Sequence, residues 1–145
     1  MVVLKEITRE NFDEVLALSV AEHQESYVST VSVSLAQAYV YRDTAFPFAI
    51  YADEKPVGFI MLGYYESRKQ YTLWKFLIDK EHQGKGYGKE ALKQGITYLT
   101  EQFGAKEIYT GVSLGNEAAK GLYKSVGFVE TGLVEDGMEE MRLEC

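Results

Sequence analysis

A glycine-rich segment between a strand-like run and a helix-like run constrains the fold of this chain more than any other feature. Residues 78–89 read IDKEHQGKGYGK, and the three glycines alternate with other residues: Gly84, Gly86 and Gly88. Glycines let the backbone turn tightly and point successive N–H groups at one place, beside the positive end of the following helix. Such a turn binds a phosphate or pyrophosphate, and Lys85 and Lys89 add positive charge. The alternative interpretation is a flexible turn without a ligand.

The two best-known phosphate-binding loops match this segment poorly. The P-loop has four residues between its glycines, followed by Gly-Lys-Ser or Gly-Lys-Thr, and the segment has neither feature. The dinucleotide-binding loop follows an early strand and reads Gly-x-Gly-x-x-Gly, whereas these glycines are two apart and lie in the middle of the chain. The sequence therefore predicts a phosphate-binding turn of another kind.

Hydrophobic periodicity predicts strands and helices around this turn. Strands are expected over 2–7, 48–52, 57–65, 71–78, 107–112, 128–134 and 138–143. Helices are expected after Thr8, from Ser32 or Ser34 to about Arg42, over 88–103, and from an Asn116 cap to Gly127. Short turns over 53–56 and 135–137 should form hairpins. This order predicts a mixed α/β (α+β) fold, with a largely antiparallel sheet and helices on its faces, rather than a doubly wound parallel sheet.

Length and composition fit one globular domain over residues 1–145, with 46% apolar and 26% charged residues. Fifteen basic and 22 acidic residues give a net charge of −7, which argues against a nucleic-acid-binding surface. The acidity suits a cationic substrate, but solubilising charge is the simpler interpretation.

The few cysteine and histidine residues limit the chemistry of the chain. One cysteine, Cys145, excludes an intrachain disulfide, and with only His23 and His82 a zinc site lacks ligands. Residues 1–6 lack the basic and apolar regions of a signal peptide. No apolar run approaches the roughly 20 residues that a membrane helix needs. We therefore expect a cytoplasmic protein without a metal and without membrane contact.

Two motifs give the chain a resemblance to a known family. Gln83–Gly88 matches the Gln/Arg-x-x-Gly-x-Gly/Ala pattern of the GNAT superfamily of acyl-CoA N-acyltransferases. Asn116–Phe128 matches the Asn, Leu-Tyr and Gly-Phe run of that superfamily. The motifs occur in the family's order and at a typical separation, and the predicted order of elements extends the resemblance over essentially the whole chain. Within the superfamily, the chain looks like the bacterial spermine/spermidine acetyltransferases.

The resemblance implies a site for acetyl-CoA. The main chain of the strand before the turn would bind the pantetheine arm through Phe76, Leu77 and Ile78. The turn and the start of the helix would hold the pyrophosphate through Gln83, Gly84, Lys85, Gly86, Tyr87, Gly88 and Lys89. Asn116 and Ala119 would contact the pantetheine arm or its surroundings, and Asn116 can be a plain helix cap as well.

Tyr123 stands where the family usually has a general acid. A phenol directed at the sulfur can protonate the CoA thiolate that leaves when an amine attacks the thioester. Helix spacing alone would make Tyr123 a core residue, because it shares a stripe with Ala119, Leu122 and Val126. The surrounding motif favours the acid.

The residues on the acceptor side are less well determined. An ammonium with a pKa of about 10.4 must lose a proton before it attacks, at about 1.4 kcal/mol for each pH unit below that value. Vertebrate polyamine acetyltransferases have a glutamate–aspartate pair on the strand before the turn, where this chain has Trp74 and Lys75, so no base follows from the resemblance. Glu25 and Glu66 are local alternatives. Polyamine binding should use spaced carboxylates and aromatic walls, for which the candidates are Glu22, Glu25, Glu66 and Trp74; each acid is otherwise a solvated surface charge.

The leading hypothesis is acetyl-CoA-dependent N-acetylation of a polyamine such as spermine or spermidine, by direct attack in a ternary complex. One alternative keeps the chemistry but uses a protein N-terminus, an amino acid or a drug as the acceptor. Another is a non-catalytic acyl-CoA-binding sensor, which would have no use for an acid at Tyr123. Cys145 is a poor nucleophile candidate at the end of the chain. The resemblance also suits a homodimer formed along the edge of the final hairpin.

Overall fold

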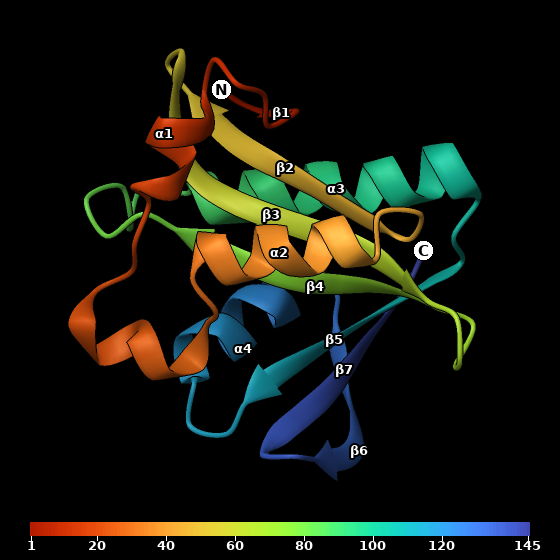
Figure 1. Cartoon of the computed structure of the whole chain (residues 1–145). Helices are drawn as coiled ribbons and strands as arrows, with labels where there is room; N and C mark the ends of the chain where they lie inside the picture. The colour runs from red at the N-terminus through yellow and green to blue at the C-terminus, as the bar shows by residue number, and fades with distance from the viewer.

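The computed structural model describes all 145 residues and arranges seven strands in one sheet (Figure 1). The strands are β1 (Val2–Lys5), β2 (Ala45–Ala52), β3 (Lys55–Tyr65), β4 (Gln70–Ile78), β5 (Glu107–Ser113), β6 (Val129–Glu135) and β7 (Met138–Glu144). Their order across the sheet is β1-β2-β3-β4-β5-β7-β6. The β4–β5 pair is parallel, and the other five pairs are antiparallel. The predicted mixed, mostly antiparallel sheet is confirmed.

Helices cover both faces of this sheet, as predicted. They are α1 (Phe12–Leu16), the 3₁₀ helix η1 (Glu22–Tyr27), α2 (Val31–Val40), α3 (Tyr87–Phe103) and α4 (Glu117–Ser125). In Figure 1, α1 and α2 lie in front of the sheet and α3 lies behind it. Neighbouring residues of a strand point to opposite faces. Phe59 of β3 accordingly packs with Val15 and Ala38 of α1 and α2, whereas Ile60 packs with Leu92 of α3.

Strand β2 begins earlier than the sequence analysis predicts, at Ala45 rather than Phe48. Pro47 is therefore inside the strand, opposite Met61 of β3. This is tolerated because β1 pairs only with residues 49–52 of β2, so the missing N–H of Pro47 leaves no β1 partner unsatisfied. The β2–β3 turn is also shorter than expected. It consists of Asp53 and Glu54, both at positive φ, as a two-residue hairpin requires.

Two helix starts differ from the prediction. Thr30, not Ser32 or Ser34, caps α2, and its side chain accepts a hydrogen bond from the Val33 N–H at 3.2 Å. Thr8 does not cap the first helix. Its hydroxyl accepts from the N–H of Glu10 in the preceding turn, and α1 itself spans five residues. The predicted end of α3 is confirmed, because Gly104 follows it in the left-handed conformation.

Candidate active site

A cleft opens between β4 and β5 because these parallel strands separate part-way along. They pair over Tyr71–Leu73 of β4 and Ile108–Thr110 of β5, although β4 runs on to Ile78 and β5 to Ser113. Beyond this pairing, β4 stays paired with β3, and β5 stays paired with β7. The facing edges of the two strands therefore have no strand partner. They line a cleft of about 710 Å³, together with η1, the glycine-rich turn and α4.

A β-bulge lies where the two strands part. The β3–β4 register pairs Met61 with Lys75 and Leu62 with Leu73, so Trp74 is an extra residue in β4. A bulge bends its strand and increases the local twist. The second half of β4 consequently turns away from β5, and residues 76–78 line the open side of the cleft.

The glycine-rich turn borders the cleft at the start of α3. Gly84 and Gly86 have φ values of +79° and +83°, which glycine adopts without strain. A Cβ atom at either position would meet no protein atom within 4 Å, so both glycines face open space. Gly88 has a different role, because a Cβ there would lie 3.3 Å from the side chains of Leu122 and Phe76. The first two glycines leave room for a ligand, and the third lets α3 pack closely.

The side chain of Gln83 points into the protein rather than out of the turn. Its Nε2 donates to the Ile78 carbonyl and to Gln24 Oε1, both at 2.9 Å. In return, Gln24 Nε2 donates to Gln83 Oε1 at 3.2 Å. Gln24 Oε1 also accepts from the N–H of Ala21 at the start of η1. This reciprocal amide pair fastens η1 to the turn, so Gln83 can offer a ligand its main chain but not a free side chain.

Asn116 caps α4 as predicted. Its Oδ1 accepts a hydrogen bond from the Ala119 N–H at 3.3 Å, and both residues line the cleft. The Nδ2 group of Asn116 donates to no protein group. The cap and a ligand contact are therefore compatible.

Tyr123 projects from α4 into the interior beside the cleft. It is 7% exposed, and its ring centroid lies 6.4 Å from that of Phe76 and 5.8 Å from that of Phe128. Burial raises the pKa of its phenol to about 12, because the charged phenolate would lose its hydration. The phenol is thus a protonated hydrogen-bond donor at neutral pH.

On the other face of β4, the Lys75 side chain reaches the connection between η1 and α2. Its Nζ donates to Ser29 Oγ at 2.8 Å, and it forms no ion pair. Burial lowers the pKa of this ammonium. No aspartate or glutamate lines the cleft; its titratable side chains are Tyr27, Lys75, His82, Tyr87, Lys89 and Tyr123.

Comparison with known proteins places this chain in a family. Residues 6–128 match the model of the family described as acetyltransferase (GNAT) family. The chain belongs to the GNAT acetyltransferase family. Two relatives from Bacillus subtilis are similar over 95% of this chain and 94% of their own lengths. One, from subspecies natto, is named a probable spermine N(1)-acetyltransferase and is 34% identical. The other is named a spermine/spermidine N(1)-acetyltransferase and is 33% identical.

Solved structures have the same fold as this GNAT chain. The spermidine N-acetyltransferase of Vibrio cholerae, crystallised with CoA and spermine, has a TM-score of 0.79 and 21% identity, and the match covers 99% of this chain and 95% of that one. The PaiA N-acetyltransferase of Thermoplasma acidophilum in complex with coenzyme A has a TM-score of 0.75 and 17% identity, covering 100% and 99%. The GNAT-type fold predicted from the sequence is confirmed.

The acetyltransferase uses acetyl-CoA, as its family does, and the cleft gathers most of the residues predicted to bind it. Eleven of the predicted residues line the cleft: Phe76, Leu77, Ile78, Gln83, Gly84, Gly86, Tyr87, Gly88, Lys89, Asn116 and Ala119. Lys85 is exposed and is not part of the lining. An open, glycine-walled turn at the start of a 17-residue helix fits a pyrophosphate. The individual roles stay predictions.

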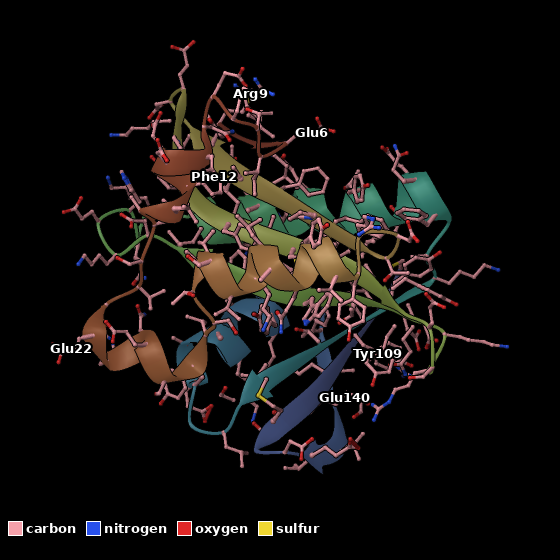
Figure 2. All side chains as sticks on the ribbon, in the orientation of Figure 1. Glu6, Arg9, Phe12, Glu22, Tyr109 and Glu140 are labelled. Atoms are coloured by element: carbon pink, nitrogen blue, oxygen red, sulfur yellow. The ribbon has the colours of Figure 1, made fainter.

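Of the four predicted acceptor residues, only Trp74 lines the cleft. The ring of Trp74 meets that of Tyr41 edge-on, with 5.8 Å between the ring centroids. Glu22 and Glu25 are exposed residues of η1, and Glu22 lies at the outer side of this helix in Figure 2. Glu66 is exposed in the β3–β4 turn, at the opposite end of β4 from the glycine-rich turn. None of these three acids lines the cleft.

Sequence reasoning did not single out three polar residues that line the cleft: Gln24, Ser29 and Lys75. Gln24 contacts a residue 59 positions away, and no local pattern reports such a contact. Lys75 could have been identified from the sequence, because it occupies one of the two positions on the strand before the turn where vertebrate polyamine acetyltransferases have an acid. No group of three or more His, Cys, Asp or Glu side chains could hold a metal ion, and no helix is long and apolar enough to cross a membrane. Cys145 is exposed and outside the cleft.

Proposed function

We propose that this acetyltransferase transfers the acetyl group of acetyl-CoA to a primary amine of a polyamine such as spermine or spermidine, by direct attack in a ternary complex. The observation that supports this most strongly is that side chains from both faces of the sheet line one cleft. Phe76 and Tyr123 lie on the α3–α4 side, whereas Leu77 and Ser29 lie on the side of α2. Donor and acceptor can therefore enter from opposite faces and meet between the strands.

The donor would occupy the α3–α4 side. The main chain of Phe76–Ile78 has no strand partner on the β5 side and would bind the pantetheine arm. Gly84, Gly86 and the N-terminus of α3 would hold the pyrophosphate, with Lys89 beside it. This assignment directs the thioester toward Tyr123, because α4 borders the same side of the cleft.

Tyr123 would assist departure of the thiolate. As the amine nitrogen bonds to the carbonyl carbon, the C–S bond breaks and its electron pair stays on sulfur. A thiol has a pKa of about 8.5, so complete transfer from a phenol whose pKa is about 12 is uphill by about 5 kcal/mol. Tyr123 therefore acts first as a hydrogen-bond donor to the developing thiolate, and any proton that it gives up must be replaced at once by one from the amine.

A polyamine suits the distribution of charge. The cleft lining contains no carboxylate, so the reacting end is not held as a paired ammonium, and its neutral, nucleophilic form is favoured there. The other ammonium groups would extend toward Glu22 and Glu25, which flank lining residues of η1. Trp74 and Tyr27 would contact the apolar chain between the charges.

An acceptor panel tests this function. Purified protein with acetyl-CoA is given spermine, spermidine, butylamine, 2,4-diaminobutyrate or a short peptide, and release of the CoA thiol is followed. We expect kcat/KM for spermine to exceed that for butylamine by at least about tenfold and to fall as salt rises. Equal values, or a preference for the diamino acid, would contradict a polyamine acceptor.

Two substitutions refine the same test. Glu25→Gln should raise the spermine KM more than the acetyl-CoA KM, which is the signature of lost acceptor binding. Glu66→Gln is the matched control, because Glu66 lies in the turn at the far end of β4 and should leave both constants unchanged. A larger effect at Glu66 would reverse the assignment.

A further inference from the structure

The acceptor enters this reaction as an ammonium and must lose a proton before it attacks. No aspartate or glutamate lines the cleft to receive that proton. We propose that Lys75 is the base that takes the proton from the attacking ammonium. The proposal deepens the acetyl transfer proposed above and rests on it.

The position of Lys75 on β4 supports this role. Phe76 and Ile78 face the α3–α4 side, where the donor is proposed to bind, whereas Lys75 and Leu77 face the opposite side. Lys75 is thus one residue away from the main chain proposed to hold the pantetheine arm, but its amine is on the acceptor side. An amine that approaches the thioester from η1 and α2 would pass Lys75 Nζ.

The surroundings of Lys75 favour its neutral form. Its hydrogen-bond partner is the uncharged Ser29 hydroxyl, at 2.8 Å. The elements packed around the cleft contribute no aspartate or glutamate to its lining. The turn contributes His82, α3 contributes Tyr87 and Lys89, and η1 and α4 contribute the phenols of Tyr27 and Tyr123. Burial already lowers the pKa of Lys75. An incoming ammonium is a like charge and lowers it further.

The proton balance of the step closes. Neutral Lys75 accepts one proton from the acceptor ammonium, and the free amine then attacks the thioester carbon. The nitrogen loses a second proton as the amide forms, and the departing thiolate gains one with the help of Tyr123. Lys75 returns its proton to solvent, so that each turnover releases one amide, one CoA thiol and one proton.

Variants at this position separate a base from a fixed charge. Lys75→Met keeps the apolar stem but removes the amine, and Lys75→Arg keeps the positive charge but cannot be deprotonated. Lys89→Met is the matched control, because it removes the other lysine of the cleft on the cofactor side. The full-length proteins are compared for kcat between about pH 6 and pH 10, with spermine and butylamine in parallel. Calorimetric CoA binding and melting temperature verify folding.

We expect both Lys75 variants to lose about 10²-fold in kcat near pH 7. This loss should shrink toward pH 10, where a large share of the acceptor amine is already deprotonated in solution. Lys89→Met should raise the acetyl-CoA KM and keep the wild-type pH profile. A wild-type kcat in Lys75→Arg, or a loss of kcat that is constant with pH, would overturn the proposal that Lys75 is the base. If wild type does not prefer spermine but the pH effect appears with both amines, the polyamine proposal fails and the role of Lys75 stands.

Discussion

Replacing Tyr123 with phenylalanine separates its chemistry from its packing. Its ring contacts with Phe76 and Phe128 need no hydroxyl, so the substitution keeps them. Tyr123 adjoins the cleft, and its hydroxyl oxygen is not among the buried polar atoms that lack a hydrogen-bond partner. Removing the hydroxyl breaks no hydrogen bond to the protein, and it relieves at most part of the cost of about 1–3 kcal/mol that a fully buried, unpaired group would carry. We therefore expect stability to stay unchanged or to rise by up to about 1 kcal/mol, which corresponds to at most about 4 °C in Tm.

Catalysis should change in the opposite direction. Without the donor at the leaving sulfur, kcat should fall by about 10²-fold or more, which corresponds to about 2.7 kcal/mol of transition-state stabilisation. The acetyl-CoA KM should stay within about twofold, because the hydroxyl acts in the transition state and not in binding. Thiol release at saturating acetyl-CoA and spermine measures kcat, and scanning calorimetry measures Tm.

Tyr98→Phe is the matched control for this experiment. Tyr98 is a partly buried tyrosine of α3 that packs against Phe46 and Phe48, and burial raises the pKa of its phenol too. It lies outside the cleft, so its loss should leave kcat unchanged. Normal turnover of Tyr123→Phe would make Tyr123 a core aromatic only, and an equal loss in both variants would show that the effect is not specific to the cleft.

Four further predictions follow from the same geometry. The pKa of Tyr123 is about 12 in the folded state and about 10 in the unfolded state. The free energy of unfolding should therefore keep its full value below about pH 10 and fall by about 2.7 kcal/mol between pH 10 and 12. Urea unfolding of Tyr123→Phe should lack this decrease. Gly86→Ala places a Cβ at φ +83°, which should cost about 1–2 kcal/mol and weaken CoA binding in calorimetry. Thr30→Ala and Asn116→Ala each remove a helix cap, worth about 1 kcal/mol in thermal unfolding, but only the second should also weaken CoA binding. Light scattering should detect the expected homodimer, and charged substitutions along the exposed edge strand β6 should reduce it.

The glycine-rich turn and the Asn116 cap that border the cleft could be predicted because their signals are local. Gly84 and Gly86 have positive φ values, which only glycine adopts readily, so their positions appear directly in the sequence. Asn116 caps the helix whose third residue is Ala119, within the span that capping patterns describe. These residues act through their own neighbours in the chain, and the prediction needed no tertiary contact.

Other features depended on contacts that a single sequence does not report. Thr30, Ser32 and Ser34 can all cap a helix, and the start at Thr30 is the one that buries Val31 and Ala38 against the sheet. Pro47 could join β2 only because β1 is short enough to end before it. The side of the cleft next to α2 includes a hydrogen bond from Lys75 of β4 to Ser29 in the connection between η1 and α2, two residues that are 46 positions apart.

The placement of charge separates attraction of the substrate from its activation. The chain has 22 acidic residues, yet none of them lines the cleft. An acidic exterior draws a polycation toward the protein from a distance, whereas carboxylates at the reacting end would stabilise the ammonium and oppose its deprotonation. The acid-free lining and the proposed base Lys75, whose pKa is lowered by burial, do the reverse, because they favour loss of the proton only where the nitrogen must attack. A polyamine can use both features at once, since its distal ammonium groups can stay near the acidic exterior while one terminal amine enters the cleft.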